Sequence, residues 1–322
     1  MAKSMLSAAR YHDEAAALAF IEARVWPNGP VCPKCGEMIH VGRLQGKSTK
    51  LGMCKCYVCR KPFAATVGTI MESSHIPLHV WLQAMHLLCT SKKGISTQQL
   101  HRTLGVTLKS AGFLVHRISE AMNENRDMFT PGLGGGGAVV EGDETYIGRK
   151  AESRAYEPPA EKQAVMSLVQ RGGMVRSFHV RNVDAANLRP IIARHVYKDT
   201  RFMSDESAIY IGIGWNFKEH GTVVHSAKEY VRGDVYTNTV EGYFSILKRG
   251  IYGVYQHVSE AHLQRYLHEF DFRYTNRIAR GVDDAARVDL AVRGIKGKRL
   301  TYRTIGRGGW ANLNSPISGF PA

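Results

Sequence analysis

The chain has 322 residues, of which 44% are hydrophobic, and its 43 Lys and Arg against 28 Asp and Glu give a formal net charge of +15. This composition excludes a disordered chain and indicates two or three domains of about 100–200 residues each. The positive charge favours a polyanionic partner, most often nucleic acid, over a basic protein with no such partner.

No apolar run in the sequence reaches the roughly 18 residues that a membrane-spanning helix needs. The first residues lack the apolar core and the cleavage site of a secretory signal. We therefore expect a cytoplasmic, nucleoid-associated protein with no membrane contact. In that compartment, cysteines are more often metal ligands than disulfide partners.

Five of the six cysteines lie between positions 32 and 59. Two CxxC pairs are separated by 20 residues, and they are Cys32/Cys35 and Cys56/Cys59. This spacing predicts one structural Zn²⁺ held by four thiolates in a zinc ribbon, within a first domain of residues 1–72. Cys54 is left over and could replace Cys56 as a ligand, although only Cys56 forms a CxxC pair with Cys59. Cys89 lies in an apolar helix and is expected to pack in a core. The many Lys and Arg of the ribbon fit either a DNA-contacting module or a purely structural one.

Residues 73–129 have helical patterning throughout. We expect helices over Ser96–Leu104 and Thr107–Met122, joined by a turn at Gly105–Val106. Two helices joined by a short glycine turn are typical of a helix-turn-helix, although an ordinary helical hairpin has the same pattern. In the first case, the residues that face the bases would be Thr107, Lys109 and Ser110. The next segment, 130–137, has five glycines in six positions and is predicted to be a flexible linker.

Residues 138–295 have the pattern of strand, hairpin around Arg171, helix, strand, helix, strand and helix, which is the order of an α/β RNase H-like domain. Asp143 would lie on the first strand, Asp205 just past the fourth, and Glu241 on the late helix, with 35 residues between Asp205 and Glu241. Lys248 follows Glu241 by two helical turns and shares its face. Three converging carboxylates predict a site for two Mg²⁺ or Mn²⁺ ions, which would support in-line attack on phosphorus.

Three other polar residues near this site have alternative interpretations. We expect Glu141 and Glu144 to be solvated acids at the strand end, although Glu141 shares a face with Asp143 and could support it. His225 would either position DNA or pack. In the predicted C-terminal tail, 296–322, basic residues around Tyr302 could follow phosphates, and they are Lys296, Lys298, Arg299 and Arg303.

Several segments together resemble a known family, and they are CPKCG, CYVCRKPF, GTIMESSHIPLHVW, LHRTLGV, VEGDETYIG, SDE and TNTVEGYFSILKRGIYGVY. They are similar to insertion-sequence transposases of the DDE class, in particular to the zinc-ribbon bacterial family related to the eukaryotic Merlin elements. The similarity extends from about Tyr11 to Tyr302. It implies an RNase H-like core, two divalent metals and binding to the terminal inverted repeats of the element.

The resemblance assigns the first two metal ligands to Asp143 and Asp205. It leaves the third between Asn238 and Glu241, and we prefer Glu241 because a carboxylate binds Mg²⁺ better than an amide does. Lys248 would contact DNA phosphate.

We therefore expect a transposase that acts on double-stranded DNA, at inverted repeats and target, as a homodimer or higher oligomer. The alternatives are a DNA-binding regulator derived from a transposase and a metal-dependent nuclease without strand transfer.

Overall fold

The protein is described by a computed structural model that covers residues 4–124, 131–148 and 162–299. The helices are α1 (Glu14–Val25), α2 (Leu78–Thr90), α3 (Thr97–Leu104), α4 (Leu108–Ala121), α5 (Ala185–His195), α6 (Ala208–Gly214), α7 (Asn238–Gly250), α8 (Glu260–Thr275) and α9 (Asp284–Arg293). The strands are β1 (Val41–Arg43), β2 (Cys54–Cys56), β3 (Pro62–Phe63), β4 (Val139–Ile147), β5 (Gln163–Gln170), β6 (Val175–Val180), β7 (Arg201–Asp205), β8 (Glu219–Val223), β9 (Val231–Arg232) and β10 (Val235–Tyr236). None of the described helices has the length and apolar character needed to cross a bilayer.

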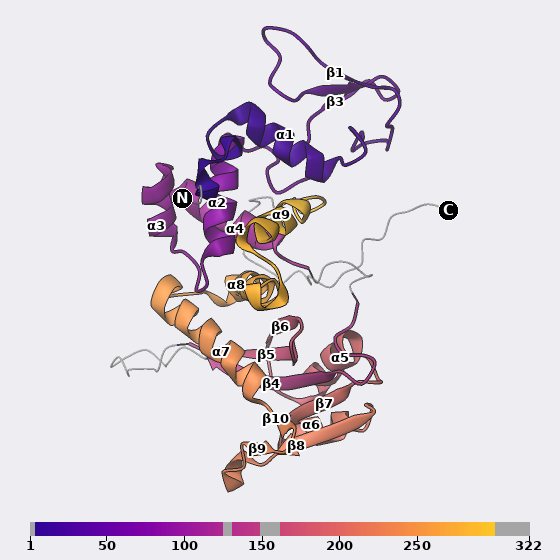
Figure 1. Cartoon of the computed structure of the whole chain (residues 1–322), viewed down its shortest axis with the longest axis vertical. Coiled ribbons are helices and arrows are strands. Elements are labelled where there is room, and N and C mark those ends of the chain that lie inside the picture. Colours follow the sequence, from indigo (N-terminus) through magenta and orange to yellow (C-terminus); the bar gives the residue numbers. More distant parts are fainter. Residues whose placement is uncertain (1–3, 125–130, 149–161, 300–322) are drawn as a thin grey trace, which may run out of the picture.

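The elements form two groups, with α8 between them (Figure 1). Helices α1 to α4 and α9 gather at one end together with the ribbon strands, and the large sheet lies at the other end. Helix α8 contacts α4 on one side and β6 on the other. The two halves that the glycine run separates in sequence are therefore in contact through this helix.

The first group has one apolar core, here called the N-terminal core, which includes Trp81, Leu114 and Val292. The three short strands of the ribbon are antiparallel in the order β1-β2-β3, and Phe63 of β3 contacts Trp26 edge-on. Helices α3 and α4 are joined at Gly105, whose φ of +67° is the left-handed conformation that glycine adopts at low cost. The predicted N-caps both form, since Ser96 accepts from the amide of Gln99 at 3.2 Å and Thr107 from that of Ser110 at 3.1 Å.

The large sheet has the strand order β6-β5-β4-β7-β8. Strands β4, β5 and β6 form an antiparallel meander, whereas β7 runs parallel to β4 and β8 parallel to β7. The predicted hairpin is present, with Arg171 in the turn between β5 and β6. Helices cover both faces: Phe202 packs with α5 and with Tyr210 of α6 on one face, and Ile147 packs with α7 and α8 on the other. Both faces of the central strand β4 are therefore largely covered, although Tyr146 near its end is exposed.

Helix α8 also covers the free edge of β6. Three outward backbone amides of that strand donate to α8 side chains: Val175 to Thr275 Oγ1 (3.2 Å), Ser177 to Asp271 Oδ2 (2.7 Å) and His179 to Gln264 Oε1 (2.8 Å). Such an edge would otherwise offer unpaired amides to another chain.

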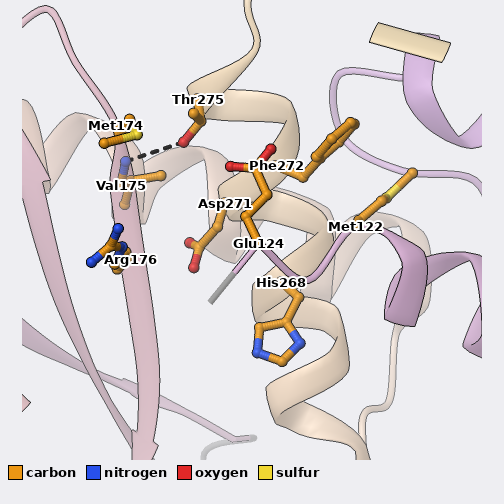
Figure 2. Close-up of a pocket in the computed structure, with 9 residues that line it drawn as sticks. All are labelled: Met122, Glu124, Met174, Val175, Arg176, His268, Asp271, Phe272 and Thr275. Carbon is orange, nitrogen blue, oxygen red and sulfur yellow. Dashed lines mark hydrogen bonds between the residues drawn. The ribbon is translucent and has the colours of Figure 1, made fainter. Parts of the chain in front are cut away.

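Figure 2 shows the small cavity beside the Val175–Thr275 bond, where the end of α4, strand β6 and helix α8 meet. Its volume of ≈ 20 Å³ has room for about one water molecule, far below the roughly 300–1,000 Å³ of a small-molecule site. Burial raises the pKa of Asp271 beside it to about 7. The cavity belongs to the joint between the two groups of elements and is not a substrate site.

The glycine run differs from the flexible linker that we predicted. Gly134 to Gly137 all have positive φ, between +59° and +83°. The amides of Gly134, Gly135 and Gly136 donate to Gln170 (3.1 Å), Thr200 (3.0 Å) and Asp199 (2.6 Å). A side chain at Gly134 would place its Cβ 2.1 Å from Thr200 Oγ1. These glycines serve close docking onto the sheet in a left-handed conformation, not chain mobility.

The end of the described chain returns to the N-terminal core. Val288, Ala291, Val292 and Ile295 pack there with α2 and α4, so the last residues of the expected catalytic domain, 138–295, share a core with residues before the glycine run. Most of the expected tail, including Tyr302 and Arg303, lies outside the described residues. Of its described basic residues, Lys298 donates to the Ala121 carbonyl at 3.1 Å and Arg299 pairs with Glu72 at 3.3 Å.

Candidate active site and zinc site

The four cysteines of the CxxC pairs come together at one end of the ribbon. The Sγ atoms of Cys32 and Cys59 are 3.6 Å apart, as are those of Cys35 and Cys56. All four lie within 4.8 Å of one another. A tetrahedral Zn²⁺ with Zn–S bonds of ≈ 2.3 Å would separate its sulfurs by about 3.8 Å, so the donor set fits one structural zinc ion.

The other two cysteines lie outside the four-sulfur group, and the predicted core position of Cys89 is confirmed. Cys54 is fully buried on β2, outside the four-sulfur group, and burial raises its pKa. Cys89 is fully buried in α2 within the N-terminal core, and burial raises the pKa of its thiol to about 12. Both are packing residues in the structure.

Asp143 and Asp205 are brought together by the parallel pairing of β4 with β7. In this register Glu141 lies opposite Met203, and two residues further along Asp143 comes opposite Asp205. Asp143 shares a strand face with Ile147, which packs against α7. Asp205 faces the same side because Phe202, on the opposite parity, packs under α5 and α6.

Glu241 lies in the first turn of α7, the helix that covers this face. Its Oε1 accepts from Thr237 Oγ1 at 3.0 Å and lies 3.7 Å from His225 Nε2. Asn238, the alternative third ligand, is the first residue of the helix and is exposed. Lys248 is half-buried on the same helix, seven residues or about 10 Å along its axis from Glu241.

The electrostatics of Asp143 reflect this clustering of acids. Burial is the main cause that raises its pKa to about 7, and the charges of Glu144, Asp205 and Glu241 raise it further. The amide of Glu144, which donates to Asp143 Oδ1 at 2.7 Å, acts in the opposite direction. The carboxylate oxygens do not form a group as tight as the cysteine sulfurs, which are the only such tight group among the residues that the structure describes.

The expectation that Glu141 and Glu144 are solvated acids is wrong. Glu141 is fully buried and accepts four hydrogen bonds, from Arg171, Val240 and two groups of Thr239. Glu144 is half-buried on the opposite strand face, where it accepts a 2.5 Å bond from the buried Tyr210. Burial raises the pKa of Glu144 as well.

His225 lies beside Glu241. Neither of its two predicted roles, positioning DNA or packing, required this contact. Its ring is 5.4 Å from that of Tyr230, and its backbone amide donates to Glu206 Oε2 at 2.7 Å. Sequence analysis did not identify Arg171, Thr239 or Tyr210. The sequence feature that pointed to these residues was Glu141, because it occupies the same strand face as Asp143.

Comparisons with known proteins agree with this organisation. A family model described as "ISXO2-like transposase domain" matches residues 133–275, and one described as "Transposase zinc-ribbon domain" matches residues 12–62. The chain is 27% identical over 271 residues to a protein of Halobacterium salinarum described as "Uncharacterized protein in transposable element ISH50", a match that covers 77% of this chain and 86% of that protein.

Two solved structures are also similar, at low scores. They are "Crystal structure of a pre-cleavage Mos1 transpososome" (12% identity, 66% of this chain and 73% of that chain, TM-score 0.25) and "Crystal structure of the Mos1 Strand Transfer Complex" (11% identity, TM-score 0.26). The second match covers 65% of this chain and 73% of that chain. At these TM-scores neither structure supports an argument about this chain. The two family models show a transposase zinc-ribbon domain and an ISXO2-like transposase domain in this chain, and the relative is a protein of a transposable element.

Proposed function

We propose that this transposase binds the terminal inverted repeats of its element and uses a two-metal site of Asp143, Asp205 and Glu241 to cleave and join DNA strands. The observation that carries the proposal is the convergence of three acids from separate chain segments on one face of the sheet. The pairing of β4 with β7 aligns the two aspartates, and the first turn of α7 holds the glutamate over the same face.

We also propose that the sheet and its helices form an RNase H-like domain. Three antiparallel strands followed by two parallel ones, in the order β6-β5-β4-β7-β8, support this assignment. In such an open sheet, ligands bind at the carboxyl ends of the parallel strands. Asp205 is the last residue of β7, at that end.

The acids suit hard divalent cations such as Mg²⁺ or Mn²⁺, which take oxygen ligands. The raised pKa of Asp143 supports a cation site, because the nearby acids repel one another and a bound cation would stabilise their ionised forms. Asp143, Asp205 and Glu241 would hold two such ions between them. When bound, such ions activate an attacking water or 3′-hydroxyl and stabilise the leaving oxygen.

Within this site the chain's own residues have distinct roles. Asp143 and Asp205 would hold the metals, and Glu241 would complete the set from α7. We assign the third metal-ligand position to Glu241 rather than to Asn238, because the charge of Glu241 contributes to the raised pKa of Asp143. Lys248, about 10 Å further along the helix, is positioned to contact a DNA phosphate near the site.

Recognition of DNA is assigned to the N-terminal half. The N-terminal end of α4 exposes Thr107 and Lys109, which suits a helix-turn-helix that presents this end to base edges. The zinc ribbon adds exposed basic residues, among them Lys34, Lys47 and Arg60. We further propose that the protein acts as a homodimer or higher oligomer on DNA, since an element has two ends to be joined.

The test is cleavage and strand transfer on inverted-repeat DNA in Mg²⁺ with Asp143→Asn and Asp205→Asn. Both should reduce the chemistry by orders of magnitude and leave repeat binding, measured by gel shift, intact. Glu219→Gln is the matched control, because Glu219 lies on the same sheet at the opposite end of β8 and should leave activity unchanged. Full activity in both aspartate variants would exclude this site. A protein that cleaves but never joins would be the nuclease alternative, and one that binds without cleaving would be the regulator.

A further inference from the structure

Glu141 is a fully buried carboxylate on the central strand of the sheet, and three of its four hydrogen bonds come from α7. Its Oε2 accepts from the backbone amides of Thr239 (2.8 Å) and Val240 (3.0 Å). Its Oε1 accepts from the hydroxyl of Thr239 at 2.8 Å and from Arg171 Nε at 2.6 Å. The two amides belong to the first turn of α7, where helix N–H groups have no partner within the helix.

The helix therefore receives its cap from a distant strand. The residue at the N-cap position, Thr237, makes no side-chain bond to the helix amides and instead donates to Glu241. A negative charge at a helix N-terminus is favourable because the helix dipole is positive there. Glu141 thus replaces the local cap with one that ties the start of α7 to β4.

Arg171 completes this connection from the turn between β5 and β6. Besides Glu141, it donates to the carbonyl oxygens of Asp234 at 2.7 Å and Tyr236 at 2.9 Å, on the segment that leads into α7. Its guanidinium also lies 3.4 Å from the ring centre of Tyr236. The pair therefore holds both the approach to the helix and its first turn.

The position of this pair relative to the acids gives it a consequence for the site. Glu141 precedes Asp143 by two residues on the same strand face, and Val240 directly precedes Glu241. We propose that Glu141, held by Arg171, is a positioning residue that sets Glu241 over Asp143 and Asp205 and so determines the metal affinity of the site. This inference rests on the proposed function, because it takes the three acids as metal ligands.

A neutral side chain of the same shape cannot accept all four of these hydrogen bonds. Each Glu141 oxygen accepts two hydrogen bonds, and all but one of the donors are amide or guanidinium groups that cannot become acceptors. In Glu141→Gln, the side-chain NH₂ must face either the two helix amides or Arg171 and Thr239. Buried donors are then left unpaired, and the first turn of α7 is expected to shift.

The experiment measures Mn²⁺ binding by electron paramagnetic resonance on the full-length, zinc-loaded protein, with thermal unfolding recorded for each variant. Glu141→Gln should weaken Mn²⁺ binding by about tenfold or more, the range found for groups that orient metal ligands. Glu241→Gln should weaken it at least as much. The double variant should be no weaker than Glu241→Gln alone, because Glu141 acts only through Glu241.

Glu269→Gln is the matched control, because Glu269 is also fully buried and paired with an arginine, Arg273, but lies on α8. It should lower the unfolding temperature and leave Mn²⁺ affinity unchanged. Arg171→Lys, which keeps the charge but not all three contacts, provides a milder variant if Glu141→Gln does not fold, and should weaken Mn²⁺ binding by a few-fold.

The outcomes separate this inference from the function on which it rests. The positioning role would be overturned if folded Glu141→Gln or Arg171→Lys bound Mn²⁺ as tightly as the wild type. It would also be overturned if the losses of affinity in Glu141→Gln and Glu241→Gln multiplied in the double variant. Neither outcome would affect the proposed metal site. If Asp143→Asn and Asp205→Asn also bind Mn²⁺ as the wild type does, the metal site itself is wrong and both proposals fail.

Discussion

Replacing Asp143 by Asn should stabilise the protein in the absence of divalent metal. Burial and the nearby acids raise the pKa of Asp143 from 3.8 to about 7. The unfolded chain therefore releases this proton near its ordinary pKa, whereas the folded chain keeps it until about pH 7, so the folded state loses stability as the pH rises between the two values. The difference corresponds to at most about 4 kcal/mol above pH 7. The asparagine side chain in Asp143→Asn would carry no charge at any pH, and it can still accept from the amide of Glu144.

Thermal unfolding of zinc-loaded protein tests this prediction, with no chelator, because a chelator would remove the structural zinc. At about pH 8, Asp143→Asn should unfold on the order of 5 °C above the wild type, and at about pH 5 this gap should be less than half as large, because the folded wild type then keeps its proton. Asp271, which has a similar pKa, is present in both proteins and cancels in the difference. Added Mg²⁺ should stabilise the wild type alone and reduce or reverse the gap.

In the control position, Glu219, the pKa is shifted in the opposite direction. Arg201 lowers the pKa of Glu219, so Glu219→Gln should give no stabilisation at about pH 8. Equal unfolding temperatures of wild type and Asp143→Asn at both pH values, or equal stabilisation of both by Mg²⁺, would refute the electrostatic reasoning.

Three further predictions concern the zinc, the DNA and the third ligand. Metal analysis should find one zinc per chain in the wild type and in Cys54→Ala, and much less in Cys35→Ser. The reason is that Cys35 belongs to the four-sulfur group, whereas Cys54 does not. Repeat binding should weaken steeply with salt, and Lys109→Ala should weaken binding to the repeats more than binding to unrelated DNA, because Lys109 is assigned to base edges. In strand-transfer assays, Glu241→Gln should be as damaging as Asp143→Asn and Asn238→Ala less so, whereas an active Glu241→Gln with a dead Asn238→Ala would move the third ligand to Asn238.

Local patterns accounted for much of this structure. The spacing of the CxxC pairs predicted the four sulfurs that meet, because each pair is a tight turn whose ligands are neighbours in sequence. The helices around Gly105 lie within one residue of their predicted bounds, since Ser96 and Thr107 are caps that act within three residues. The order of strands and helices after residue 138 was likewise predicted from periodicity.

Features that depend on distant partners were missed or misjudged. The conformation of the glycine run depends on Thr200 and Asp199, more than 60 residues away. The packing of α9 in the N-terminal core depends on helices near the start of the chain. That packing has a practical consequence: a fragment that begins at the glycine run would expose Val288 and Val292, so DNA recognition is better tested by substitution than by truncation.

The three acids of β4 could have been sorted by one physical constraint. Helices cover most of both faces of this central strand, and an acid that they bury must be paired, cap a helix or hold a cation. Glu141 is accounted for by Arg171 and the amides of α7, and Glu144 by Tyr210. Asp143 accepts one backbone amide, and the charged groups that act on its pKa are all acids. By elimination, Asp143 is the acid of this strand that needs a cation, and its alignment with Asp205 indicates where that cation would bind.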